Sequence, residues 1–147
     1  MKFLFVSVGK PHDFLFADAI TEYTLRISRV IPAEWHLISS RDVKQEGEAI
    51  LKLKKPDDVW IVLDEHGKQS STTAFAEMLD RRMSGGAKRI VFVIGGAYGL
   101  DQSVLDAAEL TISLSAMTLP HQLVRVVLAE QVYRALSILR GGKYHHE

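Results

Sequence analysis

Short apolar runs alternate along the chain with segments in which apolar residues recur every three to four positions. The runs have the length of buried strands, and the segments have the period of amphipathic helices. In the first helical segment, for example, Phe16, Ile20, Tyr23 and Ile27 fall on one stripe. The predicted strands are residues 2–8, 34–39, 59–64, 89–94 and 110–114. The predicted helices are residues 14–29, 43–54, 72–83, 101–109 and, approximately, 121–140.

This alternation predicts an α/β fold, with a mainly parallel sheet flanked by helices on both faces. The chain contains no repeat, low-complexity tract or linker, so we expect one domain over all 147 residues. Boundary residues support the helices, because Ser70 or Ser71 can cap the third and Asp101 the fourth. The pairs Gly85-Gly86 and Gly141-Gly142 fit helix ends that need a left-handed residue.

Composition narrows the class of protein. A chain with 47% apolar and 24% charged residues is typical of a globular protein. Its 18 basic and 18 acidic residues balance, so composition gives no electrostatic argument for nucleic-acid binding. Cysteine is absent, which excludes disulfides, thiolate nucleophiles and cysteine-bound zinc. The first apolar run is short and ends at Lys10-Pro11, so we expect a cytoplasmic protein without a signal peptide or membrane span.

Three segments with polar or glycine residues lie at the ends of predicted strands: residues 63–67, the glycines Gly95, Gly96 and Gly99, and residues 115–118. The carboxyl ends of parallel strands open on one edge of the sheet, where ligands bind. The glycine spacing matches neither the GxGxxG dinucleotide fingerprint nor a phosphate loop. A tight strand-to-helix turn is the competing interpretation, and we favour it for the glycines taken alone. The edge as a whole predicts a ligand site of unspecified type.

The loop at residues 114–121 combines small side chains, two hydroxyls and a proline. Small side chains expose backbone donors and acceptors, which suits the recognition of a flat base edge. The competing interpretation is a capped helix entry with Thr118 as the N-cap, and it is preferred for the loop taken alone.

The last predicted helix is apolar on nearly every face, so we expect a homodimer that buries it. Its polar exceptions are Arg125 and the pair Glu130 and Arg134, which stand four residues apart and can form an ion pair. His121 and Arg125 lie one turn apart near the start of the helix. Such a pair can bind an anion or stabilise a developing one, but a structural partner for Arg125 is an equal alternative.

Taken in order, the glycine turn, the string from Ser115 to Ala135 and the closing Tyr144-His145 closely resemble a known family. It is the bacterial large-subunit rRNA pseudouridine N3-methyltransferases, the RlmH type of the SPOUT superfamily. The resemblance covers the whole chain. It implies a trefoil-knotted α/β domain, a homodimer, and S-adenosylmethionine bound in the knot. The substrate it implies is a pseudouridine in helix 69 of 23S rRNA, methylated at N3 on the assembled ribosome.

The same resemblance implies two sets of site residues. The candidates for catalysis or substrate positioning are His121, Arg125, Tyr144 and His145. The candidate cofactor contacts are Leu63, Gly95, Leu114, Ser115, Ala116, Met117, Thr118 and Leu119.

Physical chemistry suggests roles for the first set. A cationic Arg125 would favour the N3 anion, and neutral His121 or His145 can accept the N3 proton. Tyr144 can stack on the base or orient a histidine. The rival hypotheses are a SPOUT enzyme that acts on another RNA such as tRNA, and a nucleotide-binding dimer without chemistry. A metal site built from the terminal histidines is a further alternative, but we expect no metal.

Overall fold

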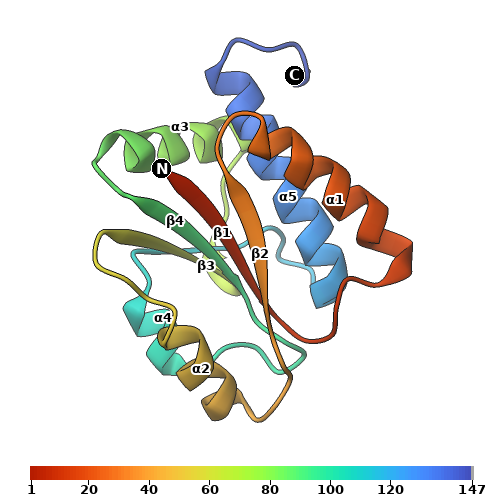
Figure 1. Ribbon diagram of the computed structural model, residues 1–147, viewed down its shortest axis with the longest axis vertical. Coiled ribbons are helices and arrows are strands. Elements are labelled where there is room, and N and C mark those ends of the chain that lie inside the picture. Colours follow the sequence, from red (N-terminus) through yellow and green to blue (C-terminus); the bar gives the residue numbers. More distant parts are fainter. Residues whose placement is uncertain (147) are drawn as a thin grey trace.

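The computed structural model describes residues 1–146 and contains a five-stranded sheet with the strand order β2–β1–β4–β3–β5 (Figure 1). Every strand pairing is parallel, which confirms the predicted α/β fold class. The strands are β1 (Lys2–Val8), β2 (Ala33–Ile38), β3 (Asp58–Lys68), β4 (Arg89–Ile94) and β5 (Leu110–Ile112). The helices are α1 (Phe14–Ser28), α2 (Val43–Leu51), α3 (Thr72–Ser84), α4 (Gln102–Ala107) and α5 (His121–Leu139).

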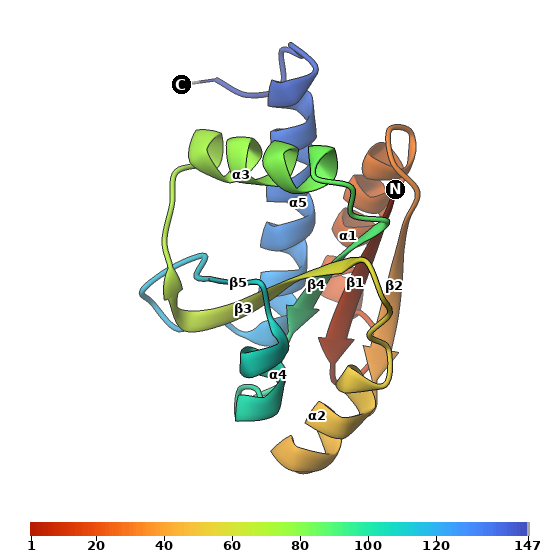
Figure 2. The ribbon, with the colours of Figure 1, turned by 90° about the vertical axis from the view of Figure 1, so that its left-hand side faces the viewer.

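The helices form two layers, one on each face of the sheet. Helices α1, α3 and α5 cover one face, and α2 and α4 cover the other (Figure 2). Strand β1 shows how the sequence produces this arrangement, because its side chains alternate between the two faces. Phe3 and Phe5 belong to the core under α1, α3 and α5, while Leu4, Val6 and Val8 belong to the core under α2 and α4. A strand buried on both faces therefore has a continuous apolar sequence.

Four of the five helices begin at the predicted residue, and all five end within three residues of the predicted end. Ser71 accepts a hydrogen bond from the Ala74 backbone at the start of α3, and Asp101 caps α4 in the same way. Gly86 and Gly141 have φ angles of 88° and 69°, as the predicted left-handed ends of α3 and α5 require. The trefoil knot and the single-domain organisation stay predictions. Glu147, the last residue of the predicted tail, lies outside the described residues.

The third strand is longer than predicted. We expected the strand to end at Asp64, but β3 continues to Lys68, which pairs with Ile112 after a shift in register. The sequence gives no strand signal here, because these residues are polar or glycine and three of them, Glu65, His66 and Lys68, are exposed. Gly67 makes it possible, since a Cβ there would lie 2.6 Å from the backbone carbon of Ile112. The extension brings polar residues of β3 beside the loop that follows β5.

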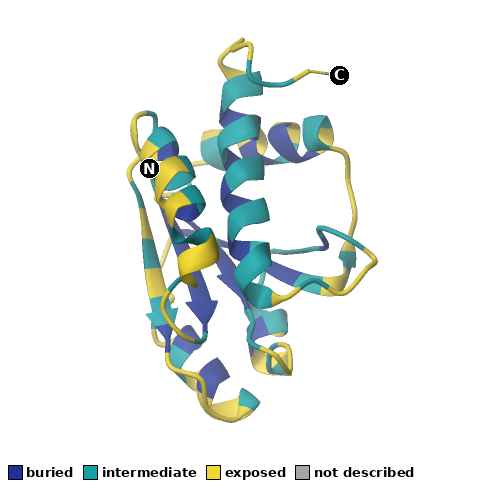
Figure 3. Ribbon diagram, turned by 90° about the vertical axis from the view of Figure 1, so that its right-hand side faces the viewer, coloured by how far each residue is buried: buried dark blue, intermediate teal, exposed yellow. Residues whose placement is uncertain are grey.

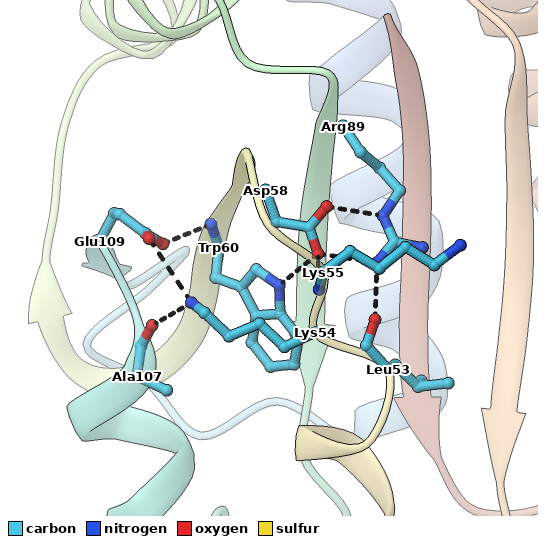
Figure 4. A network of polar contacts seen from close by, with 8 residues as sticks. All are labelled: Leu53, Lys54, Lys55, Asp58, Trp60, Arg89, Ala107 and Glu109. Carbon is cyan, nitrogen blue, oxygen red and sulfur yellow. Dashed lines mark hydrogen bonds and ion pairs between the residues drawn. The ribbon is translucent and has the colours of Figure 1, made fainter.

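A polar network fastens the sheet at the amino ends of β3 and β4 (Figure 4). Arg89 donates to both carboxylate oxygens of Asp58, over 2.9 and 2.7 Å, and also to the Leu53 carbonyl over 2.6 Å. The Trp60 indole N–H and the Lys55 backbone N–H donate to the same carboxylate. Burial alone would raise the pKa of Asp58, but these hydrogen bonds hold its pKa below the usual value. The network lies at the edge of the sheet opposite the carboxyl ends of its strands.

We expect Arg89→Met to lower the free energy of unfolding by about 3–5 kcal/mol, because it leaves a buried carboxylate without its cation. The Asp58 side chain is only 2% exposed. Since the folded-state pKa of Asp58 is lowered, its stabilisation is present above the unfolded pKa of about 4 and is lost as pH falls through the folded value. Denaturant unfolding between pH 7 and 3 measures both effects.

The neighbouring exposed pair provides the matched control. Lys88 and Asp57 are 3.1 Å apart with side chains 79% and 56% exposed, so Lys88→Met should cost no more than about 1 kcal/mol. Equal losses in the two variants would show that the buried network does not stabilise the sheet.

Among the described residues, no helix is long and apolar enough to cross a membrane.

Candidate functional site

A cavity of about 830 Å³ opens at the carboxyl ends of β3, β4 and β5. Its size lies within the range of small-molecule sites. The carboxyl edge of a parallel sheet is where ligands of α/β proteins usually bind. The lining residues are Leu63, Asp64, Glu65, His66, Ile94, Gly95, Gly96, Ala97, Tyr98, Gly99, Leu100, Ser113, Leu114, Ser115, Met117, Thr118, Leu119, Pro120, His121 and Val124.

This cavity brings together the three segments that the sequence placed at one edge of the sheet. Of the candidate cofactor contacts, all except Ala116 line it. His121 is the only one of the four catalytic candidates among its lining residues.

The glycine loop forms one wall of the cavity as a tight turn. The Gly99 N–H donates to the Gly96 carbonyl over 3.1 Å, and Gly99 has a φ of 80°. A Cβ on Gly95 would lie 2.8 Å from Cγ of Leu100, so only glycine allows the turn to close this tightly. The turn interpretation is therefore confirmed, and the same turn lines the cavity.

The loop after β5 forms the opposite wall. The Met117 N–H donates to the Ser115 hydroxyl over 2.9 Å, and the Ser113 hydroxyl donates to the Ser115 carbonyl over 2.8 Å. The expected cap by Thr118 is wrong, because α5 begins after Pro120 without a side-chain cap. The Thr118 hydroxyl instead donates to a carboxylate oxygen of Glu65 over 3.3 Å. The loop is therefore connected to the extension of β3 across the cavity.

The charged lining of the cavity is acidic. Within the described part of the chain, the lining contains the carboxylates Asp64 and Glu65 but no lysine or arginine. Such a lining favours a cationic ligand and disfavours one that carries phosphate groups. The sequence marked residues 64–67 as part of this edge, but the acidic character of the cavity needs the structure, because it depends on which side chains line it.

Arg125 is completely buried beside the cavity and does not line it. Its Nε donates to the Ser7 hydroxyl over 2.8 Å, and its Nη1 donates to the Lys10 carbonyl over 2.9 Å. Nη1 also contacts Nδ1 of His12 at 3.2 Å. Arg125 therefore has structural partners, as the alternative interpretation required. Ser7 is on β1, and Lys10 and His12 are on the turn between β1 and α1. Sequence reasoning missed this turn, although Gly9 follows a strand end just as the other site segments do.

The charge of Arg125 affects two histidines. Burial, and then the positive charge of Arg125, lower the pKa of His121 below its usual value of 6.5. The same two causes lower the pKa of His12. Both imidazoles are therefore neutral at neutral pH, and a neutral imidazole can accept a proton.

The tail that carries Tyr144 and His145 follows the end of α5 opposite His121, as the position of the C-terminus in Figure 2 shows. The tail folds back along the helix, because the Tyr144 hydroxyl contacts Glu130 and His145 contacts Arg134. These two residues stand about 14 and 20 Å along α5 from His121, at 1.5 Å per residue. The structure therefore does not bring the four catalytic candidates together within one chain.

The tail is held in place by contacts with α1 and α5. The Tyr144 hydroxyl donates to Glu130 over 3.2 Å and lies 3.1 Å from the Tyr23 hydroxyl. Arg134 lies over the Tyr144 ring at 4.6 Å and forms the predicted ion pair with Glu130. Burial, with the hydrogen bond to Tyr23, raises the pKa of Tyr144, so its phenol stays protonated. Among the described residues, no group of three or more potential metal ligands is present.

Comparison with known proteins identifies the family of the chain. Residues 1–145 match the family described as predicted SPOUT methyltransferase. The chain is 40% identical over 157 aligned residues to a ribosomal RNA large subunit methyltransferase H of Bacteroides thetaiotaomicron, with the whole of both chains covered. A protein of the same name from Anaeromyxobacter sp. is 42% identical over 153 residues, with 99% of each chain covered. The chain therefore belongs to the SPOUT methyltransferase family.

Proposed function

We propose that the protein transfers a methyl group from S-adenosylmethionine to N3 of a pseudouridine in helix 69 of 23S rRNA on the assembled ribosome. The observation that carries the proposal is an acidic cavity at the carboxyl edge of the sheet with a neutral histidine in its wall. The names of the full-length relatives, ribosomal RNA large subunit methyltransferase H, support the class of substrate.

The cavity fits the proposed methyl donor in size and in charge. S-adenosylmethionine supplies a methyl group on a positively charged sulfonium. The Asp64 and Glu65 carboxylates favour that cation, and apolar side chains such as Leu63 and Leu114 suit an adenine ring. Backbone groups of the glycine turn and of residues 114–119 are available for its polar edges. Gly95 and the 114–119 loop remain our candidate cofactor contacts.

The proposed proton acceptor is His121. The N3 proton of a pyrimidine must leave before N3 can act as a nucleophile, and a neutral imidazole in the wall of the cavity can accept it. Burial and the neighbouring charge of Arg125 lower the pKa of His121, so the accepting form is populated at neutral pH. The same positive charge favours the N3 anion. Arg125 contributes through its field from behind the cavity wall, since its own side chain is buried.

A second copy of the chain is part of the proposal. Leu123, Val126 and Val127 form a stripe on α5 that is half-buried and lies outside both core clusters of the described residues. Most of the visible surface of α5 has intermediate burial (Figure 3). An apolar stripe on an outer helix is typical of a subunit interface.

The same dimer would explain how Tyr144 and His145 can take part in catalysis although they lie away from the His121 of their own chain. Tyr144 and His145 contact Glu130 and Arg134, about 14 and 20 Å along α5 from the His121 of their own chain. We therefore propose that they complete the cavity of the partner subunit, with the two α5 helices antiparallel. Tyr144, held protonated, would stack on the base or donate a hydrogen bond there.

The test supplies S-adenosylmethionine with a tritiated methyl group, together with assembled ribosomes, free large subunits or tRNA. We expect label only with assembled ribosomes, at N3 of the helix 69 pseudouridine. Ribosomes that already carry this methyl group are the matched control and should accept no label. Binding of the donor without transfer to any RNA would support the non-catalytic dimer, and label in tRNA would support the rival RNA substrate. ATP, which carries the same adenosine with negative charge, should not compete for binding.

A further inference from the structure

The turn between β1 and α1, residues 9–12, is fixed on two sides. On the sheet side, the Gly9 N–H donates to the Ile38 carbonyl of β2 over 2.8 Å, which continues the pairing of β1. On the helix side, Gln122 of α5 lies within 3.4 Å of the carbonyls of Lys10 and Pro11 and accepts from the Asp13 N–H over 3.1 Å. The turn therefore has little freedom to move relative to α5.

Arg125 connects the turn to α5 through several hydrogen bonds. Its environment is unusual for a buried cation. The guanidinium is 0% exposed, and its hydrogen-bond acceptors are uncharged. A buried arginine that is paired with a carboxylate loses most of its field to the partner, whereas this one keeps it. Its acceptors are the Ser7 hydroxyl, the carbonyls of Val8 and Lys10, Nδ1 of His12 and the amide oxygen of Gln122.

Gly9 brings the turn against His121. Gly9 has a φ of 121°, and a Cβ built on it would lie 3.0 Å from Nε2 of His121 and 3.5 Å from Nη2 of Arg125. A side chain at this position would therefore crowd the imidazole, which would have to shift by a few tenths of an ångström. The turn is close enough to the His121 ring to restrict the position of that ring.

We infer that this turn, which Arg125 and Gln122 hold in place, positions the His121 side chain. Gly9 and Arg125 are therefore positioning residues for the proton acceptor. The inference rests on the proposed function for the role of His121, but the positioning itself rests on the contacts around Gly9. Arg125 acts through His121 in two ways, because it fixes the turn and places an uncompensated positive charge near the ring.

Other titratable groups lie on the two sides of His121. Asp64, Glu65, His66 and Tyr98 line the same cavity. On the side of the turn are Arg125 and the two residues that contact it, Lys10 and His12. Burial and Arg125 are the causes that lower the pKa of His121. A displaced ring would become more exposed and lie farther from Arg125, so both causes would weaken together.

The test compares Gly9→Ala with Gly86→Ala. Both positions have a positive φ, so both variants carry the same kind of backbone strain, but a Cβ on Gly86 meets nothing within 4 Å. Gly9→Ala should lower kcat about 10- to 100-fold with little change in KM for S-adenosylmethionine, because a misplaced catalytic group slows the reaction more than it weakens binding. Gly86→Ala should keep the wild-type kcat.

The second measurement does not depend on methyl transfer. Histidine-selective NMR follows the titration of His121, with its signal assigned by its loss in His121→Gln. The midpoint should lie below 6.5 in the wild type and in Gly86→Ala, and rise towards that value in Gly9→Ala. Arg125→Lys, which keeps the charge but loses the forked hydrogen bonds, should lower kcat while the midpoint rises less than in Gly9→Ala.

The outcomes separate this inference from the proposed function. If Gly9→Ala matches Gly86→Ala in both kcat and the titration midpoint of His121, the turn does not position His121. If the wild type methylates no RNA but the His121 midpoint still shifts in Gly9→Ala, the proposed function fails while the positioning inference stands.

Discussion

Replacing His121 with glutamine is expected to lower the rate of methyl transfer by about 10²- to 10⁴-fold, the usual contribution of a general base. Glutamine keeps a polar side chain of similar reach but cannot accept the N3 proton. His121 is the first residue of α5 and contributes only one of the side chains that line the cavity. We therefore expect S-adenosylmethionine still to bind. Single-turnover transfer to assembled ribosomes and equilibrium binding of the donor measure the two quantities separately.

The pH dependence gives the same prediction a second test. His121 accepts a proton only in its neutral form, and burial together with Arg125 lowers its pKa from 6.5. The rate should therefore be constant above pH 6.5 and should fall only as pH decreases through the lowered pKa. In His121→Gln the remaining rate should lose this acidic limb.

His36→Gln is the matched control, because it makes the same substitution on an exposed face of the edge strand β2. It should leave the rate and its pH profile unchanged. If His121→Gln also keeps the wild-type rate, His121 is not the proton acceptor.

Mixing two inactive variants is expected to restore activity. One chain carries His121→Gln, and the other carries Tyr144→Ala together with His145→Ala. If the tail of each subunit completes the cavity of its partner, a mixed dimer contains one site without any substitution. Random exchange of subunits makes half of the dimers mixed, so we expect about a quarter of the wild-type activity. Sedimentation of the mixture should give the mass of a dimer.

The control places all three substitutions in one chain and mixes that chain with the wild type. In the proposed arrangement each mixed dimer then has no intact site, so only wild-type dimers are active. If the tail serves its own chain, the results reverse: the two single-site variants restore nothing, and the control mixture gains activity from its mixed dimers. The two mixtures contain the same substitutions, so a general effect on stability cannot produce this reversal.

Local signals in the sequence were sufficient for the elements and for the edge of the sheet that holds the cavity. Ser71 and Asp101 cap their helices as predicted, because capping involves residues only two or three positions apart. The extension of β3 to Lys68 was missed, since its pairing with Ile112 involves a register shift that no local pattern encodes. The Thr118 cap was wrong because its hydroxyl bonds to Glu65, 53 positions away in the chain.

The sequence by itself determined the succession of strands and helices along the chain and the parallel α/β class. It also determined that three site segments meet at one edge of the sheet. These features follow from periodicity and from the rule that parallel strands end on the same side. Only the tertiary structure decided that Arg125 lies behind the cavity and that Tyr144 lies against Glu130 and away from His121. The reason is physical: Arg125 bonds to Ser7 across 118 positions and Tyr144 lies against Tyr23 across 121, and such contacts arise only when the chain packs.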